Sequence, residues 1–231
     1  MVRHQLPYLL LLLLITVLLF LPALDGQFIS DDVPMIAENP MLQSPSHIAD
    51  FFSMGVWQNS ALQVEEGRLY RPLYLTWYSA LYQLGGDDAT LYHGANLVLH
   101  LINTVLLWLL LVRQFRQLKP VLLLMPVTLF ALHPVHTESV AWISGGTDLL
   151  LSLFLLSAWL GWQRWRHTAS VSVMLFSLLL FALALFTKET AVVFPLLLVA
   201  ALALQAEGWR PQQLLAAFPT SDRNYLLAAG V

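Results

Sequence analysis

The sequence predicts an all-α fold, a polytopic bundle of about six transmembrane helices with a large first extracytoplasmic loop. Three observations predict it. Of the 231 residues, 58% are hydrophobic and only 11% are charged, whereas charged residues make up about 25% of a typical soluble domain. The mean hydropathy is +0.68. Long apolar runs recur along the chain, and the charged residues gather between them.

Each apolar run is a candidate membrane span. A helix needs about 20 apolar residues to cross the hydrocarbon core, and shorter runs are tolerated inside a bundle. The candidates are 6–24, 91–112, 120–132, 141–162, 171–187 and 191–204. The third either continues through the polar stretch that follows or ends at a boundary between two shorter helices near Pro134.

The charge distribution predicts the orientation. The first run follows Met-Val-Arg-His and is long for a cleavable signal peptide, which favours an uncleaved anchor with a cytoplasmic N-terminus. Most of the 11 Lys and Arg residues then lie on the cytoplasmic side, as the positive-inside rule requires. They are Arg3, Arg113, Arg116, Lys119, Arg164, Arg166, Arg210 and Arg223. Most of the 14 acidic residues lie at the outer face.

Residues 25–90 form the predicted outer loop, which is too long for a simple connection. Two stretches within it, 48–57 and 70–84, are candidate interfacial helices. Tyr70, Tyr74, Trp77, Tyr78 and Tyr82 recur there at helical spacing, which suits an aromatic belt at the level of the lipid headgroups. The last residues, 225–231, begin another apolar run, so we expect residues 1–231 to be part of a longer membrane domain.

The first cluster of chemical interest is Asp31-Asp32, directly after the first run. Two adjacent carboxylates repel each other, which raises the proton affinity of one of them. A carboxylate with raised proton affinity can take a proton from a hydroxyl. Such a pair could also bind a divalent cation, or serve as a helix cap or a solvated loop pair. The metal at this site is therefore unknown from sequence.

Further polar residues lie beside or within the apolar runs. Arg68 and Arg71 are suited to gripping a phosphate, and equally to a headgroup contact or a salt bridge with Glu65 or Glu66. A stripe along the second run either joins helices by hydrogen bonds or lines a cavity. This stripe consists of His93, Asn96, His100 and Asn103, which share one helix face.

A last group is placed by the topology at the outer ends of the spans. A zinc site is disfavoured, because the HxxHxE spacing at 133–138 is not that of a helix-borne HExxH motif. The adjacent Lys188 and Glu189 either neutralise each other or contact a ligand. The whole group is His133, His136, Glu138, Asp148, Lys188 and Glu189.

In this order, the clusters resemble the transmembrane and tetratricopeptide-repeat O-mannosyltransferase family, a branch of the GT-C glycosyltransferases related to the protein O-mannosyltransferases. The resemblance covers nearly the whole chain. It rests on five motifs, F-I-S-D-D at 28–32, Y-R-P-L at 70–73, HxxNxxxH at 93–100, LFALHPVHTESVA at 129–141 and KETAxxxP at 188–195.

The resemblance implies an enzyme that passes a sugar, mannose in this family, from a polyprenyl-phosphate carrier to a hydroxyl of a protein or glycan acceptor. It implies catalytic roles for Asp31 and Asp32 in an inverting single displacement. It implies that Arg71, His93 and Lys188 bind the donor phosphate. The remaining substrate-binding candidates are His133, His136, Glu138, Asp148 and Glu189.

One motif departs from the family pattern. Relatives follow the HPVHTE stretch with G-R-x-D, whereas this chain reads Gly145-Gly146-Thr147-Asp148. If that arginine grips phosphate in relatives, either Arg71 substitutes for it or the activity is altered. The rival functions are a transporter or ion path and a membrane scaffold. No basic run interleaved with aromatic residues suggests a nucleic-acid partner, so the expected partners are membrane lipid, lipid-linked sugar and acceptor.

Overall fold

The computed structural model describes residues 5–58, 60–61, 69–116 and 118–206. Within these ranges every regular element is helical, which confirms the all-α prediction. Arg3, Arg68, Glu65, Glu66, Arg210 and Arg223 lie outside the described residues. The α-helices are α1 Leu6–Phe20, α2 Pro72–Gly85, α3 Ala89–Gln114, α4 Pro120–Leu132, α5 His136–Ala141, α6 Gly146–Thr168, α7 Val171–Thr187 and α8 Phe194–Ala206.

Short helical turns connect these helices. They are η2 Leu21–Asp25, η3 Val33–Ala37, η4 Pro40–Leu42, η5 Pro45–His47, η6 Asp50–Phe52 and η7 Glu189–Val193. Local sequence explains several helix ends. A proline in the first turn begins α1, α2 and α4, where its missing N–H costs nothing. Asp88 caps α3 by accepting a hydrogen bond from the Thr90 N–H at 3.0 Å.

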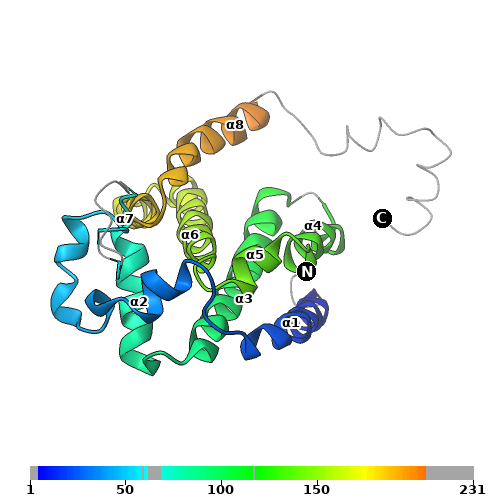
Figure 1. Cartoon of the computed structure of the whole chain (residues 1–231). Helices are drawn as coiled ribbons and strands as arrows, with labels where there is room; N and C mark the ends of the chain where they lie inside the picture. The colour runs from blue at the N-terminus through cyan, green and yellow to red at the C-terminus, as the bar shows by residue number, and fades with distance from the viewer. Residues whose placement is uncertain (1–4, 59, 62–68, 117, 207–231) are drawn as a thin grey trace.

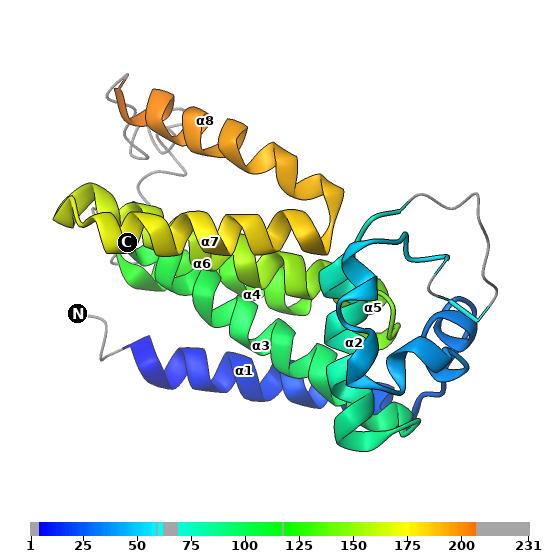
Figure 2. The same cartoon turned by 90° about the vertical axis from the view of Figure 1, so that its left-hand side faces the viewer.

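The long helices run side by side, and α2 lies with the first loop at one end of them (Figures 1 and 2). We call this the loop end, formed by residues 26–58, α2 and α5. The opposite end carries the last turns of α3 and α6, and we call it the arginine end because Arg113, Arg116, Arg164 and Arg166 lie there. The two ends of the bundle therefore differ in chemistry, and each can hold a different kind of site.

The centre of the bundle is α3 with α6 and α7. Helix α6 packs along both α3 and α7, and α3 also packs on α1 and α4. Small and polar residues bring these helices close. Ser177 Oγ donates to the Ala158 carbonyl across α6 and α7 at 2.6 Å, and Asn103 Nδ2 donates to the Leu149 carbonyl across α3 and α6 at 2.8 Å. Such interhelical hydrogen bonds are the usual contacts of helices packed in lipid.

Two helical segments in the described residues are long and apolar enough to cross a membrane, Leu6–Asp25 and Ala89–Gln114. Three further apolar helices are shorter, Pro120–Leu132, Val171–Thr187 and Glu189–Leu202. At 1.5 Å per residue, a helix of 13 residues reaches only about 20 Å, less than the hydrocarbon thickness of about 30 Å. The total of about six spans therefore stays a prediction.

The predicted helix 141–162 is wrong at its start. The chain leaves α5 at Ala141 and begins α6 only at Gly146. Asn96 Nδ2 donates to the carbonyls of Trp142 and Ile143 at 3.1 and 3.2 Å, which satisfies backbone groups that a continuous helix would pair internally. A boundary near Pro134 is present, because α4 ends at Leu132 and α5 begins at His136.

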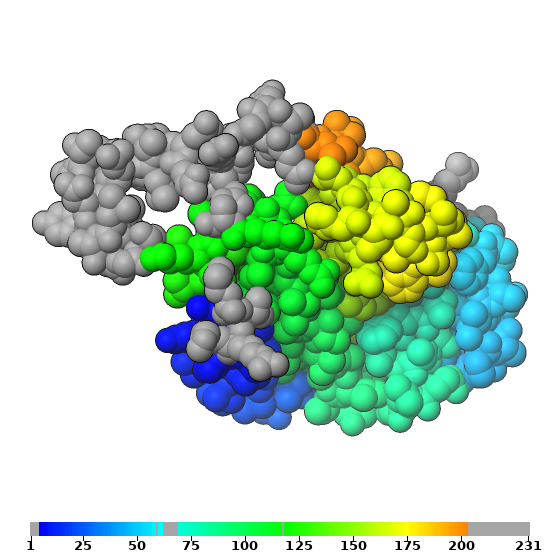
Figure 3. Space-filling view, turned by 180° about the vertical axis from the view of Figure 1, so that it is seen from behind, coloured from blue at the N-terminus to red at the C-terminus, as the bar shows by residue number. Residues whose placement is uncertain are grey.

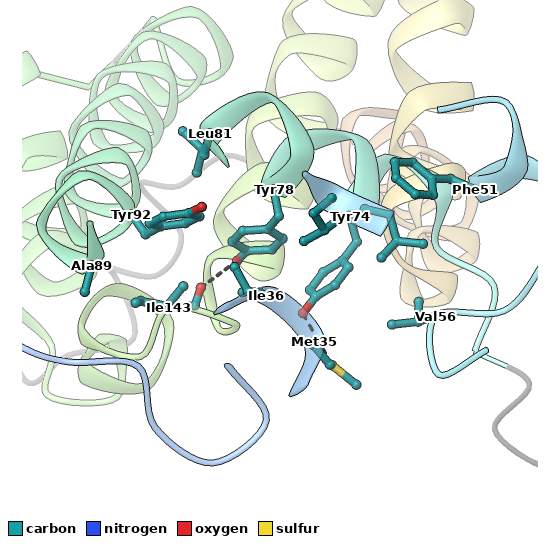
Figure 4. Close-up of a cluster of buried hydrophobic side chains, with 12 residues drawn as sticks. Met35, Ile36, Phe51, Val56, Tyr74, Tyr78, Leu81, Ala89, Tyr92 and Ile143 are labelled. Atoms are coloured by element: carbon teal, nitrogen blue, oxygen red, sulfur yellow. Dashed lines mark hydrogen bonds between the residues drawn. The ribbon is translucent and has the colours of Figure 1, made fainter. Parts of the chain in front are cut away.

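The loop predictions were half right. The stretch 70–84 is helical as α2, whereas 48–57 holds only the single turn η6. Tyr74 and Tyr78 do not form an interfacial belt, because they are only 4% and 0% exposed. They lie in a core with Met35, Ile36 and Tyr92 that joins the first loop to α2 and α3 (Figure 4). Burial of these rings is what fixes the loop on the bundle.

Candidate active site at the loop end

Asp32 is fully buried, with an exposed fraction of 0%. Its Oδ1 accepts hydrogen bonds from the Ser144 N–H at 2.8 Å and from the Ser144 hydroxyl. Its Oδ2 accepts a hydrogen bond from the Ile29 N–H at 3.2 Å. A buried carboxylate needs such donors to offset the loss of its hydration. Asp32 therefore ties the first loop to the segment between α5 and α6.

Ser144 is placed by the break between α5 and α6. The chain turns tightly there, since a Cβ added to Gly145 would lie 2.1 Å from the Glu138 carbonyl oxygen. Asn96 on α3 holds the preceding carbonyls, as described above. The backbone N–H of Ser144 is left free of helix bonding and points to Asp32.

Two tyrosines of α2 border Asp32. The Tyr78 hydroxyl donates to the Ile143 carbonyl at 2.5 Å, and the Tyr74 hydroxyl contacts Met35 Sδ at 3.4 Å (Figure 4). Burial raises the pKa of both phenols well above the ordinary value, and the charge of Asp32 raises it further. Both therefore stay protonated and neutral at physiological pH. The charges of Asp31 and Arg71 also act on Tyr74, so these groups share one neighbourhood.

His93 on α3 is 3% exposed and lies close enough to Asp32 for the charge of that carboxylate to act on its ring. The chain just after η2 passes close to it, since a Cβ on Gly26 would lie 2.6 Å from His93 Nε2. Glycine is needed there because any side chain would meet the ring. The other members of the α3 stripe mostly join helices. His100 Nε2 lies 3.0 Å from the Ala131 carbonyl oxygen, and Asn96 and Asn103 bond the α5–α6 segment and α6.

Asp31 differs from its neighbour. Its side chain is half-buried, and the hydrogen bond described for its carboxylate is a long one from the Ser30 hydroxyl, at 3.5 Å. Ser30 has a positive φ of 52°, which turns the chain just before the pair. As a result the two adjacent carboxylates have different surroundings, one fixed in the interior and one near the surface.

Arg71 and Glu189 form a bidentate ion pair. Arg71 Nε donates to Glu189 Oε2 at 2.9 Å, and Arg71 Nη2 donates to Oε1 at 2.6 Å. The bonds to Arg71 lower the pKa of Glu189 to about 2. Arg71 is 18% exposed and Glu189 57%, so the pair is screened on one side by solvent. It joins the start of α2 to the turn after α7.

Lys188 pairs with Asp148 instead of with its neighbour Glu189. Lys188 Nζ donates to Asp148 Oδ1 at 2.5 Å. Of the two alternatives that the sequence left open, mutual neutralisation of Lys188 and Glu189 is therefore wrong. The backbone is extended at Lys188, with φ −157° and ψ 139°, and successive side chains of an extended chain point to opposite sides. Two cross-helix ion pairs result.

The described contacts of the remaining predicted residues, His133, His136 and Glu138, do not include Asp32. His136 packs against His100 and Phe130, with ring centroids 4.9 and 4.6 Å apart. Burial lowers the pKa of His136. His133 and Glu138 are exposed, and His133 Nδ1 accepts a hydrogen bond from the Val135 N–H at 3.1 Å. None of the described contacts brings these three residues to the carboxylate pair.

Gly146 is the position at which the family resemblance led us to expect arginine, and it has no room for a side chain. A Cβ there would lie 2.0 Å from Asn96 Oδ1. Within the described residues, no group of three His, Cys, Asp or Glu side chains could hold a metal ion. A divalent cation at Asp31 and Asp32 therefore stays a prediction.

Comparison with known proteins identifies relatives of the same kind. Protein O-mannosyl-transferase TMTC4 of Mus musculus is 32% identical over 198 residues, covering 77% of this chain and 27% of that protein. Protein O-mannosyl-transferase TMTC1 of Mus musculus is 32% identical over 182 residues, 74% of this chain and 19% of that protein. The resemblance to the transmembrane and tetratricopeptide-repeat O-mannosyltransferase family is confirmed.

Protein O-mannosyl-transferase F38B6.6 of Caenorhabditis elegans is 30% identical over 155 residues, 65% of this chain and 22% of that protein. The chain thus spans about a quarter of the length of these O-mannosyltransferase relatives. No protein-family model matches it, and no solved structure matches it. The relatives and the two long apolar helices make this a membrane-associated protein.

Sequence reasoning missed Ser144 and misassigned Tyr74 and Tyr78. Ser144 carries no motif signal of its own. A hint was available in the two glycines that follow it, because paired glycines often mark a tight turn that interrupts a helix. The tyrosines repeat at helical spacing, which specifies a shared face but not what covers that face.

Proposed function

We propose that this chain belongs to the membrane part of a GT-C glycosyltransferase that moves mannose from a polyprenyl-phosphate carrier to a hydroxyl of a protein acceptor. The relatives are named protein O-mannosyl-transferases, which supports a sugar transfer to protein. One observation carries the proposal. The carboxylate pair Asp31 and Asp32 lies at the same end of the bundle as two cationic side chains, Arg71 and Lys188, each of which is held in place by one carboxylate.

In this proposal the two aspartates have separate roles. Asp31 is the general base, because it is partly exposed and only weakly engaged, so an acceptor hydroxyl can reach it. Asp32 is a positioning residue that holds the loop in place through Ser144 and Ile29. The deprotonated acceptor oxygen attacks the anomeric carbon, the bond to the carrier phosphate breaks, and the carrier leaves as a phosphate anion.

Arg71 and Lys188 are the side chains that we propose bind the donor phosphate. Each is paired with one carboxylate, and each keeps further N–H donors, since guanidinium has five and ammonium three. Donor phosphate would take up those remaining bonds and stabilise the charge that develops on the leaving group. Asp148 and Glu189 then orient the two cations. His93, which lies beside Gly26 and near Asp32, is the third side chain proposed to bind the donor phosphate. With a cytoplasmic N-terminus, this site faces the periplasm, the cell exterior or the ER lumen.

The experiment is a transfer assay on membranes that contain the full gene product. Radiolabelled polyprenyl-phosphate mannose is supplied with a serine- and threonine-rich peptide, with and without chelator. Asp31→Asn should lower transfer by about 10²- to 10⁴-fold, the usual contribution of a general base. Asp87→Asn is the matched control, because Asp87 is an exposed carboxylate at the same end. If transfer survives Asp31→Asn, Asp31 is not the general base. If transfer is lost when chelator is added, a divalent cation takes part.

A further inference from the structure

A pocket of about 680 Å³ lies at the arginine end, between the last turns of α3 and α6. It is far from the carboxylate pair along the bundle, because α3 and α6 run between the two ends (Figure 2). Figure 3 looks onto this end, with α3 in green beside α6 and α7 in yellow. The pocket is lined by Arg113, Gln114, Arg116, Trp162, Gln163, Arg164, Arg166, His167 and Thr168.

The lining is cationic. It holds four arginines and a histidine, and no acidic side chain is among the described residues that line it. Some of these donors are engaged, since Arg116 Nε donates to the Arg113 carbonyl at 3.3 Å and Arg166 stacks over the Trp162 ring at 5.1 Å. Cations near helix C-termini also satisfy the helix dipole. Here four arginines near the ends of α3 and α6 converge on one pocket, more than an interaction with two helix dipoles explains.

The pocket also contains polar atoms suited to a headgroup. Gln163 is only 8% exposed and its Nε2 donates to Gln114 Oε1 at 2.7 Å. Gln163 Oε1 is buried and has no hydrogen-bond partner among the residues that the structure describes. A buried acceptor without a partner is costly, and a ligand hydroxyl or a water would satisfy it.

An apolar groove of about 420 Å³ joins the pocket. It shares Arg113 and Arg164 with the pocket and is otherwise lined mainly by apolar side chains of α3, α6 and α7, including Leu106, Leu160, Val173 and Phe176. Phe176 is 57% exposed. The two arginines therefore lie between a polar cationic hollow and an apolar channel, which is the arrangement that an amphiphile with one anionic head requires.

We propose that the arginine end binds an anionic phospholipid, with its phosphate on Arg113 and Arg164 and an acyl chain in the groove of α3, α6 and α7. Guanidinium groups bind phosphate by paired charge-assisted hydrogen bonds. Free phosphate shares that chemistry but leaves the apolar groove empty. By the charge distribution this is the cytoplasmic leaflet, where anionic lipids concentrate. The site shares no residue with the proposed transfer site, so either can fail alone.

The test uses the full-length membrane protein in a neutral detergent. Dioctanoyl phosphatidylglycerol, dioctanoyl phosphatidylcholine and inorganic phosphate are titrated at equal ionic strength, and dissociation constants are measured by microscale thermophoresis. Phosphatidylglycerol should bind at least about tenfold more tightly than either of the others, because only it offers both a net anionic phosphate head and an acyl chain. Equal binding of phosphatidylcholine, or of inorganic phosphate, overturns the proposal.

Three variants locate the site. The double variant Arg113→Gln/Arg164→Gln should weaken phosphatidylglycerol binding by about tenfold or more, through loss of two charge-assisted contacts. Lys119→Gln, an exposed cation at the same end outside the pocket, should change it by less than about twofold. Arg113→Lys/Arg164→Lys retains the charges and guards against misfolding, and it should fall between the two. Equal losses in the double and Lys119 variants would mean nonspecific attraction and overturn the assignment.

Discussion

The two ends of this helix bundle treat charge in opposite ways. At the loop end, acids and bases are paired or hydrogen-bonded, as in Arg71 with Glu189, Lys188 with Asp148, and Asp32 with Ser144. At the arginine end, four guanidinium groups line one hollow without an acidic side chain among its described lining. Paired charges fix geometry, whereas cations that converge with no carboxylate among the described lining attract an anionic ligand. The first arrangement suits a preorganised reaction site and the second suits binding.

Within the loop end, the same contrast separates two adjacent residues. Asp32 is fully enclosed and bound by backbone and hydroxyl donors, and Asp31 is half-buried with one long contact. Sequence alone gives both the same chemistry. The difference teaches that only one of two identical side chains is available to a substrate in this structure, and the following variants test that division.

The largest combined effect on transfer and stability is expected for Asp32→Asn. An amide at this position turns a donor toward the N–H groups of Ser144 or Ile29, which already require an acceptor. We expect transfer to fall by at least about 10²-fold and the free energy of unfolding to fall by about 1–3 kcal/mol. Transfer assays and thermal unfolding in detergent measure the two losses. Asp31→Asn should lower transfer without lowering stability. An equal loss of stability in Asp31→Asn and Asp32→Asn would contradict the division of roles.

An arginine at position 146, where the family resemblance led us to expect one, should destabilise this chain. Gly146→Arg forces a side chain into the space of Asn96, whose Oδ1 lies 2.0 Å from where the new Cβ would be. Overpacking of this kind usually costs about 1–3 kcal/mol. Thermal unfolding of Gly146→Arg and Gly146→Ala should show a lower melting temperature in both. Gly86 is a poor control because its φ is +61°, so Gly94→Ala is the matched control, since a Cβ at position 94 would have no atom of the described residues within 4 Å beyond the backbone of its own helix. A Gly146→Arg protein as stable as the wild type would mean that Asn96 moves aside.

Loss of the Ser144 hydroxyl should have a smaller effect. Ser144→Ala removes one of the donors to Asp32 and leaves the backbone N–H in place. We expect a loss of about 1 kcal/mol in stability and about tenfold in kcat, with KM little changed, because Ser144 positions the loop without touching substrate. Ser144→Thr should restore most of kcat, and Ser139→Ala on α5 is the control. A change confined to KM would place Ser144 in substrate binding instead.

The Arg71–Glu189 pair should contribute less still. Glu189 is 57% exposed, so solvent screens the pair and its coupling energy is expected at about 0.2–1 kcal/mol. A double-mutant cycle of Arg71→Gln and Glu189→Gln, followed by thermal unfolding, measures it. If Arg71 also binds donor phosphate, its single variant raises the KM for the lipid-linked sugar more than the Glu189 variant does. Equal KM changes would leave Arg71 with a purely structural role.

The smallest effect concerns acid. Arg71 lowers the pKa of Glu189 from 4.5 to about 2. A depressed folded-state pKa stabilises the protein above the unfolded-state value, and the contribution is lost as the pH falls from about 4.5 to about 2. The difference in melting temperature between wild type and Glu189→Gln should therefore shrink across this window. A difference that stays constant down to pH 2 would show that the ion pair is not the cause.

Much of the helical pattern could be predicted from sequence. The bounds of α4 and α7 agree with the apolar runs residue for residue, because helix formation in such runs depends on local composition, aided in α4 by Pro120 at its start. The start of α6 and the turn at 48–57 could not be predicted in this way. At Trp142–Gly145 a side chain from α3 takes the backbone bonds, and no local signal in those residues announces Asn96.

The sequence by itself determined the helical bundle, the segregation of cations and acids to opposite ends, and the placement of the carboxylate pair just after the first apolar helix. All of these follow from residue types and short spacings. Only the tertiary structure decided that Asp32 is enclosed, that Lys188 pairs with Asp148 and not with its neighbour, and that Gly146 excludes a side chain. Asp32 and Ser144 are 112 positions apart in the sequence, and Lys188 and Asp148 are 40 apart. Contacts between such distant residues, and the close approach of two helices at Gly146, depend on how the bundle packs.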